Sequence, residues 1–102
     1  MRDKTKPEYE SDRTQILRLL VEVGFREVPI DQVIAVMDQS FHTISAESLD
    51  FSLRYMADRG WVELGEEKVP GKQPRLLYAK ITAEGVEEFD RRRREVVRIG
   101  KK

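Results

Sequence analysis

Four consecutive arginines near the end of the chain are its densest group of side chains that could bind a charged ligand. Residues 91–102 carry seven basic groups and one acidic group, and the run itself is Arg91, Arg92, Arg93 and Arg94. Guanidinium groups donate hydrogen bonds in a planar fork that matches phosphate, so the run predicts contacts with a nucleic-acid backbone. Two other interpretations stay open. The arginines could pair with Glu87, Glu88 and Asp90 one helical turn earlier, or dock on an acidic surface of a second copy.

A second group of cations lies in a segment rich in glycine, proline and charge. Residues 65–74 are typical of an exposed hairpin tip, and Lys68, Lys72 and Arg75 could straddle phosphates there. Glu66 and Glu67 share the segment, and a solvated hairpin carries charge in any case. The hairpin is therefore a weaker indication of an anionic partner than the arginine run.

A third group lies on the outward side of a predicted helix that Ser45 caps. In such a helix a carboxylate can accept a hydrogen bond from cytosine but repels phosphate, and only Arg54 is an obvious donor to a base or phosphate. Phe51 and Tyr55 are spaced i, i+4, which indicates either a side-chain pair at the core edge or a contact patch for another protein. The apolar spacing turns Leu49, Leu53, Met56 and Ala57 inward and leaves Ala46, Glu47, Asp50, Phe51, Arg54, Tyr55 and Asp58 outside.

The sequence lacks the residue clusters on which most enzymes depend. His42 is the only histidine and there is no cysteine, so no His/Cys metal site is available. The segment from Gly65 to Gly71 lacks the Lys-Ser ending of a phosphate-binding loop. Paired carboxylates such as Glu66 and Glu67 fall in exposed stretches without a predicted cleft. We therefore expect a protein that is not an enzyme and that uses neither a cofactor nor a metal.

Length and composition bound the architecture. A chain of 102 residues forms one domain with a modest core. The charged start does not resemble a signal peptide, and no apolar run is long enough to span a membrane. Residues 14–90 carry eight basic and fourteen acidic groups, which is unusual for a DNA-binding domain. Together with the absence of cysteine, these features predict a cytoplasmic protein without a membrane partner.

The apolar spacing and the capping residues predict the elements that position these groups. Residues 1–11 show no apolar period and predict a flexible N-terminal arm. Asp12 with Gln15 resembles a capping box, which begins a helix that Gly24 ends, and we expect Phe25 to fold back onto the core. A second helix begins near Pro29.

Residues 61–81 predict a hairpin, and a last helix follows it. The returning strand alternates, with Leu77, Ala79 and Ile81 on one face. Thr82 caps the last helix, which can continue through Ile99. The apolar residues late in this helix have more surface than a domain of this size can cover. They predict that this C-terminal helix crosses the domain or pairs with a second chain in a homodimer.

Two segments resemble a known family. Ser45–Leu49 and the following Leu53–Val62 resemble the recognition helix and first wing strand of winged helix-turn-helix proteins, with Met56 and Trp61 in place of two frequent leucines. Residues 81–85, Ile-Thr-Ala-Glu-Gly, resemble the segment that closes the wing and opens the last helix in many such regulators. The resemblance covers about residues 12–90. In its short length the chain also resembles small winged-helix proteins of Mu-like prophages.

The resemblance implies a mainly α fold with a β-hairpin wing, in the order helix, helix, helix, strand, strand, helix. It implies a winged-helix domain over residues 12–90 and a basic C-terminal helix extension over residues 91–102. The implied function is a small prokaryotic or phage transcription regulator that binds double-stranded DNA, and the alternative is a protein-interaction module without DNA binding. The residues expected at a DNA interface are Ser45, Glu47, Ser48, Asp50, Phe51, Arg54, Tyr55, Lys68, Lys72, Arg75, Arg91, Arg92, Arg93 and Arg94.

Overall fold

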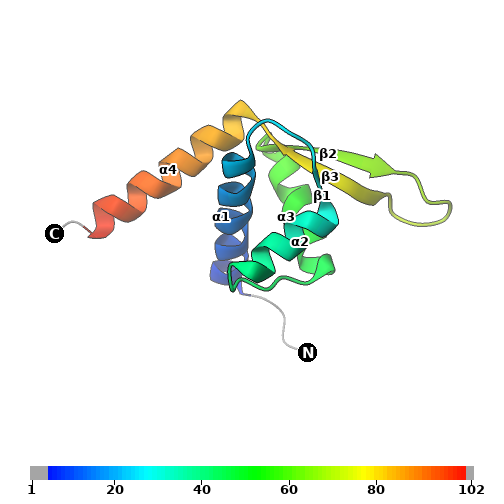
Figure 1. Ribbon diagram of the computed structural model, residues 1–102, viewed down its shortest axis with the longest axis horizontal. Coiled ribbons are helices and arrows are strands. Elements are labelled where there is room, and N and C mark those ends of the chain that lie inside the picture. Colours follow the sequence, from blue (N-terminus) through cyan, green and yellow to red (C-terminus); the bar gives the residue numbers. More distant parts are fainter. Residues whose placement is uncertain (1–4, 101–102) are drawn as a thin grey trace.

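Three helices, a β-hairpin and a long last helix make up the computed structural model, which describes residues 5–100, with side chains described to residue 95 (Figure 1). The elements are α1 (Lys6–Val23), β1 (Val28–Pro29), α2 (Ile30–Gln39), α3 (Ala46–Asp58), β2 (Val62–Glu67), β3 (Arg75–Ile81) and α4 (Ala83–Gly100). The strands form an antiparallel sheet in the order β1-β3-β2. The predicted winged-helix architecture is confirmed, and the two-residue strand β1 is an addition to it. The predicted apolar contacts of Val96, Val97 and Ile99 lie outside the described side chains.

The first helix begins seven residues before the start predicted from a cap at Asp12, because its N-cap is Thr5. The Thr5 hydroxyl accepts a hydrogen bond from the Glu8 amide at 3.4 Å, and Pro7 lies in the first turn. Residues 6–11 are therefore helical, and the prediction of a flexible arm over residues 1–11 is wrong for them. Residues 1–4 of that predicted arm lie outside the described part of the chain.

The predicted cap residue Asp12 has a different place in the structure. It lies inside α1 with only 3% of its surface exposed, so it is not an N-cap. Its Oδ1 atom lies 2.7 Å from Nε2 of His42, which follows α2. This contact ties the turn between α2 and α3 to the first helix, and it gives the only histidine of the sequence a structural partner.

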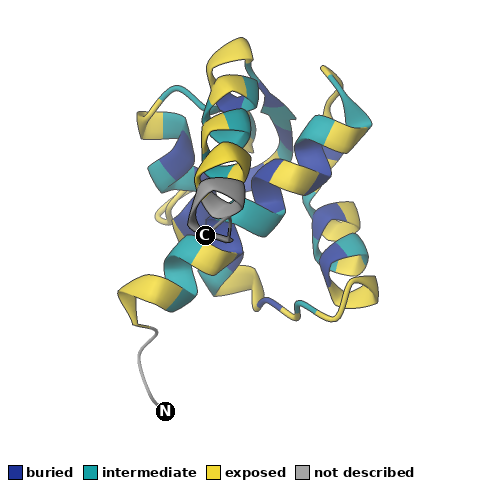
Figure 2. Ribbon diagram, turned by 90° about the vertical axis from the view of Figure 1, so that its left-hand side faces the viewer, coloured by how far each residue is buried: buried dark blue, intermediate teal, exposed yellow. Residues whose placement is uncertain are grey.

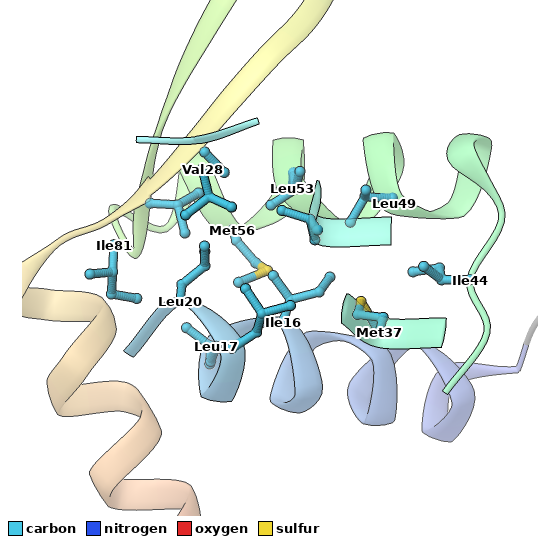
Figure 3. Close-up of a cluster of buried hydrophobic side chains, with 14 of the residues drawn as sticks. Ile16, Leu17, Leu20, Val28, Met37, Ile44, Leu49, Leu53, Met56 and Ile81 are labelled. Carbon is cyan, nitrogen blue, oxygen red and sulfur yellow. The ribbon is translucent and has the colours of Figure 1, made fainter. Parts of the chain in front are cut away.

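The core lies where α1, α2 and α3 meet the sheet, and Figure 3 shows these side chains converging from all four sides. In Figure 2 the buried residues lie on the helix sides that face one another. Leu49, Leu53 and Met56 of α3 are fully buried, which confirms the predicted inward face of this helix. Phe25 is 61% exposed, so the prediction that it folds back onto the core is wrong.

A bulge in β3 changes which side of the wing is apolar. Gly65 pairs with Tyr78 and the next residue, Glu66, pairs with Leu76, so Leu77 has no partner on β2. The extra residue reverses the alternation. Leu76 is buried and Leu77 is 42% exposed, which is the opposite of the predicted arrangement. The bulge therefore turns Leu76, on its tip side, into the core and leaves Leu77 in solvent.

The turn into α4 depends on two residues of the predicted family motif. The Thr82 hydroxyl donates to the Gly60 carbonyl at 2.6 Å and accepts from the Gly85 amide at 3.0 Å, which confirms Thr82 as a cap. A side chain at Gly85 would collide with the Trp61 carbonyl oxygen. The glycine is needed because the first turn of α4 lies directly on the backbone that enters β2.

Candidate nucleic-acid interface

The start of α3 is built as the sequence predicts. The Ser45 hydroxyl accepts a hydrogen bond from the Ser48 amide at 3.1 Å, which stabilises the first turn. Ser45 and Glu47 are exposed, whereas Ser48 is half-buried. The first turn of α3 therefore presents a hydroxyl and a carboxylate to solvent.

Arg54 connects α3 to the wing. Its Nε atom donates to Asp50 at 2.8 Å, one Nη atom donates to Glu66 of β2 at 3.1 Å, and the other donates to the Pro74 carbonyl at 2.7 Å. The hydrogen bond to Asp50, with a further contribution from Glu66, raises the pKa of the Arg54 guanidinium. Each of its three nitrogens thus donates within the chain, and Arg54 differs in this from the free base or phosphate donor that we expected.

Tyr55 does not form an exposed pair with Phe51. It is half-buried, and the Arg13 guanidinium lies 3.7 Å from its ring centroid. Arg59 lies 4.9 Å from the same centroid, and Trp61 meets the ring edge-on at 6.1 Å. The ring is part of a layer of cations and aromatic side chains at the edge of the core, which was one of the two interpretations of its spacing.

Phe51 is the exposed aromatic residue of α3. It is 53% exposed, and its ring centroid lies 5.0 Å from that of Tyr9 on α1. Tyr9 is not among the predicted site residues, because the sequence predicts a flexible arm over residues 1–11. The signal was present, since Thr5, Pro7 and Glu8 combine the spacing of a capping box with a proline in the first turn.

The wing carries its cations at and beside its tip. Lys68 and Lys72 are exposed, and neither side chain forms an ion pair among the residues that the structure describes. Arg75 pairs with Glu67 across the strands at 2.7 Å. Two of the three predicted wing cations are thus available to a ligand, and the third is partly neutralised.

The arginine run lies on α4 and is largely paired within the chain. Arg91 contacts Glu88 at 2.7 Å and Glu95 at 2.8 Å, and the hydrogen bond to Glu88 raises the pKa of Arg91. Arg92 also pairs with Glu88 at 2.7 Å, and Arg93 lies 3.8 Å from Asp90. Arg94 is exposed without an ion pair in the described region. The predicted pairing one turn earlier is therefore present for three of the four arginines.

Arg92 also joins the two ends of the fold. It donates to the Thr14 hydroxyl at 2.8 Å, pairs with Glu10 at 3.1 Å, and lies 5.3 Å from the Trp61 ring centroid. Only 11% of its side chain is exposed. Arg92 therefore packs α4 on α1, which makes it a structural residue in this chain.

The predicted site residues fall into two groups in space. The residues of α3 and the wing are brought together by Arg54, whereas the arginine run follows α4, which extends from the other side of the helical body (Figure 1). The described residues contain no group of three His, Cys, Asp or Glu side chains that could hold a metal ion. No helix in the same part of the chain is long and apolar enough to cross a membrane.

Comparison with known proteins identifies the fold. No protein-family model and no curated protein matches the chain. A PadR-like transcription factor from Bacteroides fragilis superposes with a TM-score of 0.75 and 11% identity, covering 94% of this chain and 89% of the other. The chain has the winged-helix fold of such regulators. The narrower resemblance to proteins of Mu-like prophages gains no support from this match.

Two further PadR structures agree with this assignment. A PadR-like transcriptional regulator from Bacillus cereus has a TM-score of 0.66 and 16% identity, over 94% of this chain and 90% of its own. A PadR family transcription regulator from Clostridium difficile has a TM-score of 0.68 and 13% identity, over 87% of this chain and 90% of its own. At these identities the likeness concerns the fold.

Proposed function

We propose that this chain is a DNA-binding transcription regulator of the winged-helix type, acting in the cytoplasm. In this proposal α3 enters the major groove and the wing contacts the neighbouring backbone. The observation that carries the proposal is the Arg54 network, because it fixes an exposed helix face and a hairpin with free lysines in one relative position. The structural neighbours named as transcription regulators support the same function.

The charge distribution limits how such a protein would hold DNA. Glu47 and Asp58 are exposed on α3 and repel phosphate, so affinity must come from cations elsewhere. Among the residues predicted at the DNA interface, Lys68, Lys72 and Arg94 are the cations that are exposed and form no ion pair in the described part of the chain. If each of the three neutralises one phosphate, the slope of log K against log salt is about −2.7 per chain. The predicted unspecific contribution of the arginine run would then depend mainly on Arg94.

Fluorescence anisotropy with a labelled duplex, titrated at several salt concentrations, tests the proposal. The double substitution Lys68→Ala with Lys72→Ala should make the slope shallower by about 1.8. Arg18→Ala with Arg26→Ala is the matched control, because it removes two exposed cations that lie outside α3 and the wing. This control should leave the slope unchanged.

Two results would overturn the proposal. One is no binding to any duplex by the full chain at high micromolar concentration and about 50 mM salt, since basic sites on DNA-binding proteins bind unspecifically at about 10⁻⁴–10⁻⁶ M even at physiological salt. The other is an equal change of the salt slope in the two double variants, which would mean that the wing lysines do not contribute specifically to DNA binding. Absence of binding would favour the alternative, a winged-helix protein-interaction module.

We also propose that the regulator is a homodimer formed through α4. The helix continues to Gly100, well beyond its contact with α1 at Arg92, and its sequence there includes Val96, Val97 and Ile99. Apolar residues on a helix that extends from the body need a partner surface. A chain that ends after Arg92 keeps the contacts with α1. It should sediment as a monomer with an unchanged fold, whereas a monomeric full-length chain would contradict this proposal.

A further inference from the structure

Phe51 occupies the centre of the solvent-facing side of α3. It is 53% exposed and lies between Glu47, one turn before it, and Arg54, one turn after it. An apolar ring in water at the middle of an otherwise polar helix face costs free energy that contact with an apolar group would recover. The face therefore carries a large apolar group near the middle of the helix that the proposed function places in the major groove.

The ring is held in place rather than free to turn away. Tyr9 from α1 lies against it, with ring centroids 5.0 Å apart and the rings inclined by 46°. Arg13 lies 5.8 Å from the Tyr9 ring centroid and is itself buried, so Tyr9 is in turn next to a buried residue of α1. One side of Phe51 is thus covered by the protein, and the remaining half of its surface faces outward.

The other side chains on this face are poorly placed to read bases as donors. Arg54 donates from all three nitrogens to groups of its own chain, and Tyr55 lies between Arg13 and Arg59. The Glu47 carboxylate is exposed and can only accept hydrogen bonds. The free groups of the helix face near its centre are therefore a carboxylate acceptor and a phenyl ring.

In the major groove of B-DNA the 5-methyl group of thymine is the apolar feature of the base edges, and phenylalanine is among the side chains that contact it. We infer that Phe51 is a specificity-determining residue that recognises thymine methyl groups. This inference rests on the proposed function and adds to it the chemical feature of the base that the helix reads. It predicts sites in which a thymine faces the middle of α3.

Replacing thymine with deoxyuridine tests the inference, because deoxyuridine keeps the hydrogen-bonding pattern and lacks only the methyl group. A duplex is first selected from a random library with the full-length protein, and it is then synthesised with thymine or with deoxyuridine on both strands. The thymine duplex should bind about fourfold more tightly for each methyl group that Phe51 covers. Phe51→Ala should abolish this difference, and Phe51→Leu should keep part of it.

Phe25→Ala is the matched control, since Phe25 is also an exposed phenylalanine and lies outside α3 and the wing. It should leave the preference for thymine intact, and thermal unfolding should show that all variants are folded. Equal binding of the two duplexes by the unsubstituted protein would overturn the inference and leave the proposed function standing. A preference that persists in Phe51→Ala would also overturn it, because the methyl group would then act through DNA shape. No binding to either duplex would reject the proposed function itself.

Discussion

Substituting Arg54 with alanine should loosen the wing from α3 while the helical core stays folded. The substitution removes the ion pair to Asp50, the ion pair to Glu66 and the hydrogen bond to the Pro74 carbonyl. Two of these three partners belong to the hairpin, and no other described side chain forms an ion pair between α3 and the wing. The loss should therefore be felt first where the wing leaves the helices.

The magnitude follows from the exposure of each contact. The pair with Asp50 is spaced i, i+4 on a helix and is worth about 0.3–0.5 kcal/mol. The pair with Glu66 is partly exposed and is worth about 0.5 kcal/mol, and the hydrogen bond to a carbonyl adds about 1 kcal/mol. Because 27% of the Arg54 side chain is exposed, hydrogen bonds to water compensate for part of the lost interaction energy. We expect a loss of about 1–2 kcal/mol in the free energy of opening the wing away from α3.

Hydrogen exchange and DNA binding measure this loss separately. Amides of β2 and β3 beyond the bulge, near Glu66 and Arg75, should exchange up to about tenfold faster, since 1.4 kcal/mol corresponds to a factor of ten. The amides near Val62 and Ile81 should be unchanged, because these residues are buried in the core. A double-mutant cycle with Glu66→Ala should give a coupling of about 0.5 kcal/mol.

The salt dependence of DNA binding decides between a bracing role and a direct one. If Arg54 positions the wing, Arg54→Ala should weaken binding and leave the slope of log K against log salt unchanged. A slope that becomes shallower by about 0.9 would mean that Arg54 contacts a phosphate, and the reasoning from its internal partners would then be refuted.

Three other substitutions test the fold by thermal or denaturant unfolding. Leu53→Ala should cost about 2–5 kcal/mol because Leu53 is fully buried, and a loss below about 0.5 kcal/mol would contradict the orientation of α3. Gly85→Ala should cost about 1–3 kcal/mol because its methyl group meets the Trp61 carbonyl, whereas exposed Glu87→Ala on the same helix should change stability little. The hydrogen bond from Arg91, with that from Arg92, lowers the pKa of Glu88 from its usual 4.5. Its contribution to stability is therefore complete above about pH 4.5 and is lost as the pH falls through the lower folded pKa. The difference in stability between the unsubstituted protein and Glu88→Gln should accordingly shrink in acid.

The sequence predicted those elements whose signals are local. The inward face of α3 follows from the spacing of Leu49, Leu53 and Met56, and the cap at Thr82 follows from its place before α4. The strand β1 has no such signal, because two residues carry no periodicity and Val28 is a strand residue only through its pairing with Ala79. The reversed exposure of Leu76 and Leu77 could not be predicted for a related reason. An alternating pattern assumes a regular strand register, and the bulge breaks that register.

The sequence predicts the residue types of the candidate site better than it predicts which residues they contact. Spacing placed Arg54 on the outward side of α3, where it lies, but could not show that Glu66 and Pro74 would approach it from the wing. Asp12 is a residue type that often caps helices, so its sequence position suggested a cap. In the structure it is buried and contacts His42, which lies in a distant turn. Contacts between residues far apart in the sequence decide which polar groups remain free, and a pattern along one segment does not contain them.

The last segments of the chain, β3 and α4, complete the sheet and the packing on α1, and this order affects how the chain folds during synthesis. Val28 pairs with Ala79, and the Arg92 guanidinium donates to the Glu10 carbonyl 82 positions away. Such distant pairings are slow to form because a long loop must close before they give any stability. On the ribosome, α1 to α3 emerge with their apolar faces only partly covered until β3 and then α4 follow. Nascent chains arrested before Ala79 should therefore remain open to proteases, and protection should arrive in two steps, first with β3 and then with Arg92.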